Sequence, residues 1–472
     1  MKVLFVVIDT LRADHLGRYG YHRNTSPRLD DLAKEGVLFE RAYATDVPTQ
    51  PSYTAMFTGQ RGIRSGVVSH SPTEDIPDST PYLPHILAMA GYETAAVSTL
   101  FFMKKYFARG FHTYMNPVAH DRQRIQQVTA EEINSYALPW LKANCQKDFF
   151  LFVHYWDPHG LYKAPEEKYR TMFYKGDKSD PSNHSLDALN DQLIGPFVKQ
   201  HIDNIEENIT DAEYVIAQYD GEIRYVDTKF GELIDVVKDL GIEEETLLIV
   251  TADHGESMTE HDLFFDHFGV YEPTIRVPLI VRWPHNVPAG KQARALVQGI
   301  DIPATILDAA SIELPETFQG RSLLPLARGE TEGGYEFIFS NQGLWQAKRV
   351  ISDGRWKLIK AIDNGFWPAP ALELYDLEND PGELNNLAES ELRKAMELEL
   401  RLRRWEDAQL GGGIDPLRKI ASMGLPPTPY VESIAKRREG IAWEDFRNLI
   451  DVPFKEQVER QIDVSSHPAG TS

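Results

Sequence analysis

Two apolar segments of this chain run directly into carboxylates. Residues 2–8 are followed by Asp9, and residues 246–251 are followed shortly by Asp253, His254 and a glycine. Polar residues at the carboxyl ends of neighbouring buried strands meet at one edge of a sheet. We therefore expect Asp9, Asp253 and His254 to hold one divalent cation. Such a cation is typical of an enzyme that acts on an anionic substrate.

A hydroxyl-rich segment is the candidate source of a nucleophile. Thr49 and Ser52 precede an amphipathic helical stretch over residues 53–58. A hydroxyl at a helix N-terminus and next to a cation suits this role, because both features stabilise a developing anion. The competing interpretation is a structural N-cap, which is the usual role of such a residue. The local pattern leaves both interpretations open.

Histidines supply candidates for proton transfer. Residues 149–155 predict a buried strand followed by a Pro-His turn, where His159 could act as a general acid or contact a substrate oxygen. His154 lies inside the strand, which favours a core role. His261 and His267 follow the second carboxylate segment. Each alone is typical of a surface loop, and one or both would face the site if that loop folds over it.

Alternating strand and helix patterns must position these residues. Continuous apolar runs predict strands buried on both faces, and periodic segments between them predict helices. We expect an α/β fold in which helices cover both faces of a large, mostly parallel sheet, with the site beyond the carboxyl ends of its strands. The predicted strands are residues 3–8, 94–98, 149–155, 246–251 and 277–283, and the predicted helices are residues 25–35, 82–90, 129–143, 210–239 and 301–309.

The last third of the chain has a different character. Residues 336–376 predict a small antiparallel sheet with an Asp-Gly turn, and residues 389–410 predict a charged helix. The polar residues 160–205 predict a long excursion over the site. We expect three parts: a catalytic domain (1–335), a small sheet-and-helix subdomain (336–410) and an extended tail (411–472). The tail would pack on the body or on a second subunit, as in a homo-oligomer.

Composition limits the partners. The net charge of −22 predicts no nucleic-acid partner and no membrane partner. Cys145 is the sole cysteine, so no intrachain disulfide can form. The apolar run over residues 3–8 is too short for a transmembrane helix or a signal peptide. These features predict a cytoplasmic protein, and the expected cation suits a small anionic substrate.

A series of motifs spans residues 2–390. It includes Phe57-Thr-Gly-Gln-Arg, Trp156-Asp-Pro-His and Thr251-Ala-Asp-His-Gly-Glu. In order and spacing these motifs resemble the sulfatase family of the alkaline phosphatase superfamily. The resemblance implies an alkaline-phosphatase-like α/β fold and a metal-dependent hydrolase of sulfuric or phosphoric esters.

Residues 49–53 depart from the family pattern. Sulfatases carry a cysteine, matured to formylglycine, in a Cys-x-Pro-x-Arg motif, where this chain has Thr49-Gln-Pro-Ser-Tyr. The resemblance implies that Thr49 is the nucleophile and that Tyr53 takes the place of the supporting arginine. The formylglycine mechanism is then excluded. Residues 98–101 replace a sulfate-binding Gly-Lys-Trp-His segment, which places Thr99 in the substrate-binding set.

Other departures point the same way. Asp9 is followed by a threonine where many sulfatases have a calcium-binding Asp-Asp pair, and His254 stands where an asparagine is frequent. His159 matches a catalytic histidine, and His267 replaces a sulfate-binding lysine. The set is similar to threonine-dependent phosphodiesterases and phosphoethanolamine transferases, and phosphonate monoester hydrolases share its Asp-His pair. The histidine ligand favours zinc or manganese over calcium.

We therefore predict a metal-dependent hydrolase of phosphate esters that works through a covalent intermediate. The predicted metal ligands are Asp9, Thr49, Asp253 and His254; the catalytic residues are Thr49, His159 and His267; and the substrate-binding residues are Thr99, Tyr53 and His261. A second cation is a further option, with ligands from Asp157, His159, His261 and His267. Two alternatives remain open: a sulfatase that cleaves sulfuric esters, and a non-catalytic binding protein that has kept the fold.

Overall fold

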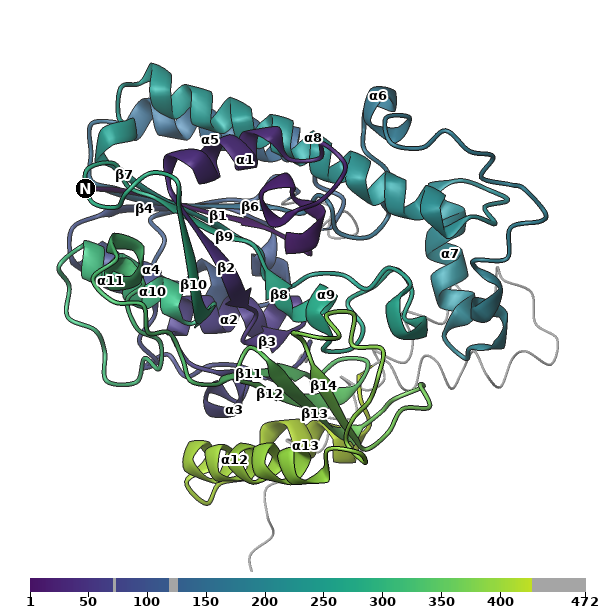
Figure 1. Cartoon of the computed structure of the whole chain (residues 1–472). Coiled ribbons are helices and arrows are strands. Elements are labelled where there is room, and N and C mark those ends of the chain that lie inside the picture. The colour runs from purple at the N-terminus through teal and green to yellow at the C-terminus, as the bar shows by residue number, and fades with distance from the viewer. Residues whose placement is uncertain (71–73, 119–125, 427–472) are drawn as a thin grey trace, which may run out of the picture.

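The computed structural model describes residues 1–70, 74–118 and 126–426 (Figure 1). Within these residues a nine-stranded sheet forms the centre of the molecule, with the order β10-β2-β9-β7-β1-β6-β4-β5 and with β8 beside β2. The strands are β1 (Lys2–Ile8), β2 (Val37–Tyr43), β4 (Glu93–Val97), β5 (Thr113–Met115), β6 (Phe149–Tyr155), β7 (Thr246–Thr251), β8 (Arg276–Val277), β9 (Leu279–Arg282) and β10 (Lys291–Gln298).

The central strands are parallel, as predicted. β1 lies between β6 and β7 and pairs in parallel with both, and β4 continues the parallel arrangement beyond β6. β9 runs antiparallel to β7 and β2. The strand predicted over residues 277–283 is divided in two, because Pro278 has no N–H to donate to a sheet. The α/β prediction is confirmed.

Two layers of helices cover this sheet (Figure 1). Every residue of β1, β6 and β7 is buried, so both faces of the sheet centre need a cover. One layer holds α1 (Pro27–Glu35), α5 (Ala130–Asn144) and α8 (Ala212–Asp239). The other holds α2 (Thr49–Thr58), α4 (Leu83–Met89), α10 (Asp301–Ala309) and α11 (Leu324–Arg328). The other helices of this part are α3 (Gly62–Ser65), α6 (Glu167–Arg170), α7 (Gly195–Ile205) and α9 (Glu272–Ile275).

The helix that carries Thr49 differs from its prediction. The predicted stretch over residues 53–58 begins four residues earlier, and Pro48 is its N-cap. All residues of α2 are buried, so the helix is not amphipathic. Phe57 packs against Phe5 of β1 and Phe152 of β6. α2 therefore fixes Thr49 within the core, directly beside the sheet.

A second sheet of five strands lies below the first in Figure 1, in the order β14-β13-β12-β11-β3. It confirms the predicted antiparallel sheet with a turn at Asp353-Gly354, but β3 joins it in parallel from far upstream. α12 packs on its outer face through Ala395, Leu398 and Leu402. The elements are β3 (Asp46–Val47), β11 (Ile338–Gln342), β12 (Ala347–Ser352), β13 (Trp356–Asp363), β14 (Leu372–Asp376), α12 (Leu392–Leu410) and α13 (Pro416–Met423).

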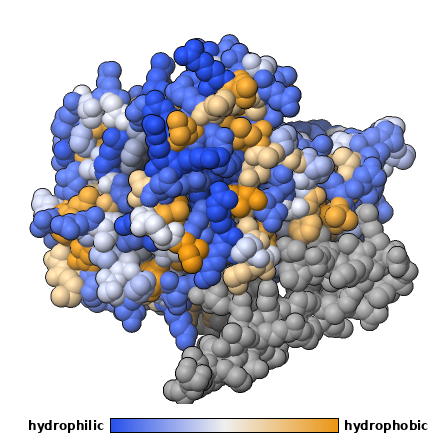
Figure 2. Space-filling view, turned by 90° about the horizontal axis from the view of Figure 1, so that it is seen from below, coloured by the Kyte–Doolittle hydropathy of each residue, from blue (hydrophilic) through white to orange (hydrophobic). Residues whose placement is uncertain are grey.

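Part of the predicted tail packs on the body. Leu417 of α13 and Leu425 are buried with Val68 and Ala347. Residues 427–472, where the rest of the tail and its subunit contacts were predicted, lie outside the described residues. The face that carries α12 shows apolar residues scattered among polar ones (Figure 2). Among the described residues, no helix is long and apolar enough to cross a membrane.

Candidate active site

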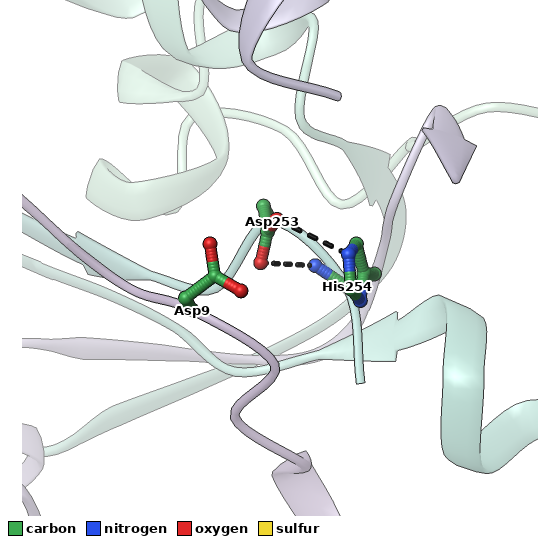
Figure 3. Close-up of side chains that lie close together, drawn as sticks. All are labelled: Asp9, Asp253 and His254. Atoms are coloured by element: carbon green, nitrogen blue, oxygen red, sulfur yellow. Dashed lines mark hydrogen bonds and ion pairs between the residues drawn. The ribbon is translucent and has the colours of Figure 1, made fainter. Parts of the chain in front are cut away.

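Three side chains meet at the carboxyl edge of the central sheet (Figure 3). Asp9 directly follows β1, and Asp253 and His254 follow β7. The register pairs Val7 with Thr251, so the two carboxylates leave adjacent strands at the same level. Potential ligand atoms of the three residues lie within 4.8 Å of one another, and all three side chains are fully buried. The structure thus brings together the three protein groups predicted around one cation.

Backbone groups pair with Asp253 Oδ1 and with His254 Nδ1. Among the described residues, Asp253 Oδ2 and His254 Nε2 have no backbone partner. Asp253 Oδ1 accepts hydrogen bonds from the backbone N–H groups of Thr10 and His254, at 3.1 and 2.9 Å. Thr10 adopts a φ of 53°, in the left-handed region that a β-branched residue rarely occupies. His254 Nδ1 lies 2.9 Å from the carbonyl oxygen of Gly255, so it must carry the proton. His254 Nε2 then presents a lone pair 3.2 Å from Asp253 Oδ2.

A second histidine holds Asp9. His154 Nε2 lies 3.2 Å from Asp9 Oδ2, and His154 Nδ1 lies 3.1 Å from the hydroxyl of Ser98. That hydroxyl also accepts a hydrogen bond from the backbone N–H of Leu100, and an ionised Asp9 carboxylate can only accept. His154 Nε2–H is then the donor to Asp9. The sequence favoured a core role for His154; its position in the structure orients a predicted metal ligand.

The remaining atoms fit a cation. Asp9 Oδ1 and Asp253 Oδ2 are buried and have no hydrogen-bond partner among the described residues. Burial, together with Asp253 and Glu256, raises the pKa of Asp9 well above its usual range. Burial lowers the pKa of His254, which keeps the ring neutral as metal ligation requires. Orphaned buried acceptors that face one another are costly unless a positive charge lies between them.

Thr49 lies against this group. Its Oγ1 is 3.3 Å from His254 Nε2, and only 1% of the residue is exposed. Ser52, the other candidate hydroxyl, donates instead to the backbone carbonyl of Asp253 at 2.8 Å. Thr49 is therefore the hydroxyl available to an ester bound at the edge of the sheet.

A second cluster adjoins the first; its histidine was predicted from the sequence, but its two carboxylates were missed. It consists of Glu256, Asp266 and His267, whose potential ligand atoms lie within 4.8 Å of one another. The rings of His267 and His254 are 4.7 Å apart, and His267 Nδ1 lies 2.8 Å from Asp266 Oδ1. In the sequence, this cluster was indicated only by the number of aspartate and glutamate residues near His267.

His267 is the positively charged member of this second cluster. Burial opposes protonation of His267, but Asp266 and then Glu256 outweigh it and raise its pKa to about 9. Burial likewise opposes ionisation of Asp266, and His267 overcomes it to lower the Asp266 pKa to about 2. His267 is thus an imidazolium at neutral pH, and its Nε2 has no hydrogen-bond partner among the described residues.

His159 is neutral by contrast. Burial, and secondarily the charge of His267, lower its pKa to about 3. Its ring packs edge-on against Trp156 at 5.2 Å and lies 6.2 Å from His267. His159 Nδ1 is buried and has no partner in the described part of the chain. His159 and His267 together face a cavity of about 250 Å³.

The sulfatase family profile matches residues 2–312, and a profile for the C-terminal region of N-sulphoglucosamine sulphohydrolases matches residues 259–408. The chain belongs to the sulfatase family. As a member of that family, within the alkaline phosphatase superfamily, it is a hydrolase that acts on sulfate or phosphate esters.

Similar proteins include both sulfatases and phosphoester-related enzymes. An ulvan-active sulfatase of Formosa agariphila is 25% identical and covers 82% of this chain and 76% of the relative. The multifunctional alkaline phosphatase superfamily protein PehA of Trinickia caryophylli is 27% identical, over an alignment that covers 82% of this chain and 91% of that relative. Among solved structures, the phosphonate monoester hydrolase of Silicibacter pomeroyi superposes with a TM-score of 0.70 at 22% identity, covering 88% of this chain and 96% of that chain.

Two predicted side chains of this sulfatase-family site lie away from the other predicted residues. His261 stacks on Tyr271 with ring centres 3.6 Å apart, on the side of the C-terminal sheet, rather than on the metal-site residues. Asp157 accepts a hydrogen bond from the backbone N–H of Ala130 at 2.7 Å, so its carboxylate caps α5. The ligand set predicted for a second cation is therefore not assembled. Contacts with neighbouring parts of the fold determine where the His261 and Asp157 side chains lie. Such contacts cannot be read from local sequence patterns.

Two other predicted contacts lie behind the site. Tyr53 Oη is 3.5 Å from Asp9 Oδ2, so it faces a predicted metal ligand. The hydroxyl of Thr99 accepts a hydrogen bond from the indole of Trp156 at 2.6 Å, and Trp156 packs on His154 and His159. These positions support the surrounding rings; direct contact of Tyr53 or Thr99 with substrate stays a prediction.

Proposed function

We propose that this protein is a metal-dependent hydrolase of phosphate esters with Thr49 as its nucleophile. One observation carries the proposal: the Thr49 hydroxyl lies 3.3 Å from His254 Nε2, beside the unpaired oxygens of Asp9 and Asp253. A nucleophile and its activating groups must lie within such a distance.

Asp9, Asp253, His254 and the Thr49 hydroxyl would hold the cation. Two carboxylates, an imidazole nitrogen and a hydroxyl favour zinc or manganese over calcium, which prefers six to eight oxygen ligands. When bound, the cation lowers the pKa of the Thr49 hydroxyl and offsets the charge of the ester. The ligand set predicted for a second cation is not assembled, whereas Glu256, Asp266 and His267 form a second group that could hold one.

The charged His267 and the neutral His159 have different roles in the remaining steps. His267, as an imidazolium, supplies a hydrogen bond to a substrate oxygen or a proton to the departing alcohol. Neutral His159 is able to accept a hydrogen bond from the water that later attacks phosphothreonine, and so to orient it. The structure therefore leads us to assign the acid to His267, whereas the sequence favoured His159 in that role.

The nucleophile favours phosphate over sulfate. By the resemblance, residues 49–53 align with the family's nucleophile motif but carry threonine in place of its cysteine, and threonine cannot mature to the formylglycine that expels sulfate by hemiacetal collapse. Water must then attack the esterified phosphorus or sulfur directly, and sulfothreonine is the harder of the two to clear. Sulfate hydrolysis remains the second candidate, because several of the similar proteins are sulfatases.

A substrate panel tests the proposal. Purified protein supplied with zinc, manganese or calcium is offered bis-4-nitrophenyl phosphate, 4-nitrophenyl phosphate and 4-nitrophenyl sulfate. We expect phosphate-ester turnover with zinc or manganese, a loss of about 1000-fold or more in Thr49→Ala, and partial activity in Thr49→Ser. Turnover of sulfate alone refutes the phosphate assignment. Full activity of Thr49→Ala refutes the nucleophile, and silence on all three esters with no bound metal favours a non-catalytic binding protein.

A further inference from the structure

α12 carries an exposed apolar row on the lower surface of the molecule (Figure 1). Leu392, Met396 and Leu400 are four residues apart, so their side chains lie in one row along the helix. They are 58%, 61% and 50% exposed, whereas the α12 residues that pack on the small sheet are fully buried. Single exposed apolar side chains are common on proteins, but three in one row form a continuous patch, which is typical of an interaction surface.

Charged side chains lie on both sides of Leu400 on the same face of α12. Arg393 and Glu397 precede Leu400 by seven and three residues. Arg404 and Asp407 follow it by four and seven residues. Spacings of three, four and seven place residues on one face of a helix, and all four charged residues are exposed. The face therefore has an apolar centre and charges toward both ends.

These charges are available to another molecule. In the described part of the chain, the side chains of Arg393, Arg404 and Asp407 have no ion-pair or hydrogen-bond partner. Glu397 pairs only with a lysine and an arginine of its own helix, at 3.0 and 3.3 Å. Exposed pairs of this kind contribute little stability, so Glu397 can exchange them for another cation at low cost.

The order of the charges is self-complementary. If a second copy of α12 runs antiparallel to the first and crosses it at Leu400, residues at similar distances on either side of the crossing point lie opposite each other. Arg393 then faces Asp407 of the second copy. Glu397 likewise faces Arg404 of the second copy, and two-fold symmetry makes each contact twice. A parallel pair would instead bring equal charges to the same level, so the charge order selects the antiparallel arrangement.

α12 is firmly held on the body of the protein. Ala395, Leu398 and Leu402 pack on the small sheet, and the buried guanidinium of Arg349 donates to Glu406 of α12 at 2.5 Å. The helix is therefore formed before any partner arrives. A preformed surface loses little conformational entropy when it binds, which favours association through a small contact area.

We propose that the exposed face of α12 is the contact surface of a homodimer, in which two copies of α12 run antiparallel and cross at Leu400. The contact is that of one helix pair, about 28 Å long. Such an interface is at the small end of specific interfaces, so we expect a Kd of about 1–100 µM. The surface takes no part in the reaction proposed at Thr49, so the dimer does not depend on that function.

Sedimentation velocity of the full-length protein, at concentrations on both sides of that Kd, tests the dimer. The wild type should change from monomer to dimer as its concentration rises. Leu400→Glu places two carboxylates against each other at the crossing point and should raise the Kd about 100-fold or more. Met89→Glu is the matched control, because Met89 is 78% exposed but lies on α4. That variant should dimerise like the wild type.

Charge reversal tests the identity and the direction of the partner. Arg393→Glu alone and Asp407→Arg alone each replace two attractions by two repulsions, so each should weaken the dimer about 10-fold or more. An equimolar mixture of these two variants should dimerise as strongly as the wild type, because each substituted side chain then faces one of opposite charge. Restoration in the mixture requires folded proteins, so misfolding cannot imitate this result.

Three results would overturn the proposal. The first is a wild type that stays monomeric at every concentration, which would leave the face to residues 427–472 or to another molecule. The second is a dimer that Leu400→Glu leaves intact, or a mixture of the two charge variants that does not restore association. The third is binding to vesicles that contain phosphatidylserine without any dimer, which would assign the face to an anionic lipid surface.

Discussion

Asp9→Asn should make the metal-free protein more stable while abolishing metal binding. Without a cation, Asp9 and Asp253 place two carboxylates within 4.8 Å of each other in the protein interior. At that distance an effective dielectric constant of about 20 gives a repulsion of about 3 kcal/mol between two full charges. The raised pKa of Asp9 relieves part of this repulsion through protonation. A gain of about 1–3 kcal/mol is therefore expected from removing one charge.

The surrounding hydrogen bonds favour the substitution. An asparagine oxygen in place of Asp9 Oδ2 still accepts from His154 Nε2, 3.2 Å away. The amide nitrogen then replaces the unpaired Oδ1 and offers donors to Asp253. Asp9→Asn should raise the Tm of the metal-free protein by about 2–6 °C, because each kcal/mol is worth about 2 °C in a chain of this size.

The assay is thermal unfolding in chelator and in excess zinc or manganese. Metal at 100 times its Kd should stabilise the wild type by about 2.7 kcal/mol and leave Asp9→Asn unchanged. Asp220→Asn is the matched control, since Asp220 is equally buried but its carboxylate is paired with His15, Tyr21 and Arg23. That variant should lose stability. A metal-free Asp9→Asn protein that melts below the wild type, with no metal response in either, would refute this account of the site.

Three further outcomes are expected. Ser98→Ala removes the hydroxyl that orients His154 and should weaken zinc affinity about 10-fold, as measured by competition with a chelating dye. Arg349→Met leaves the buried carboxylates of Glu406 and Asp415 without their partner and should cost about 3–5 kcal/mol in urea unfolding. His267 has a folded-state pKa raised to about 9, so its stabilising charge is complete below about pH 6.5 and is lost as the pH rises through 9. The free energy of unfolding of the metal-free protein should fall over that range. In the His267→Gln variant the free energy of unfolding should depend less on pH over the same range.

The sequence predicted the parts of the site that depend on strand ends. Asp9 and Asp253 follow apolar runs, and parallel pairing of those runs brings the carboxylates together by register alone. Thr49 was found through its similarity to a family motif, and the structure places its hydroxyl beside His254. These positions follow from local pattern and topology, which a single sequence records.

The remaining parts depend on how loops fold. His261 and His267 were equivalent in sequence, yet the chain between them adopts left-handed backbone at His261, Asp262 and Phe265. With these turns, the His261 ring stacks on Tyr271 and the His267 ring lies beside His254. Side-chain packing in a loop of this kind is set by distant partners, so no periodicity or spacing could have separated the two histidines.

The C-terminal sheet has a consequence for the nucleophile. Residues 46–47 leave the main body to pair with β11, and Thr49 follows two residues later. Asp46 is held at both oxygens, by the backbone N–H of Gly62 and by the side chain of Asn341. The start of α2 is therefore fixed by both sheets at once. A hydroxyl that must stay within ångströms of its activating groups gains more from such a position than from a flexible loop, because misplacement by about 1 Å can cost 100-fold in rate. The small sheet thus positions the proposed nucleophile through the backbone it holds, while Asp9, Asp253 and His254 of the proposed metal triad lie outside that sheet.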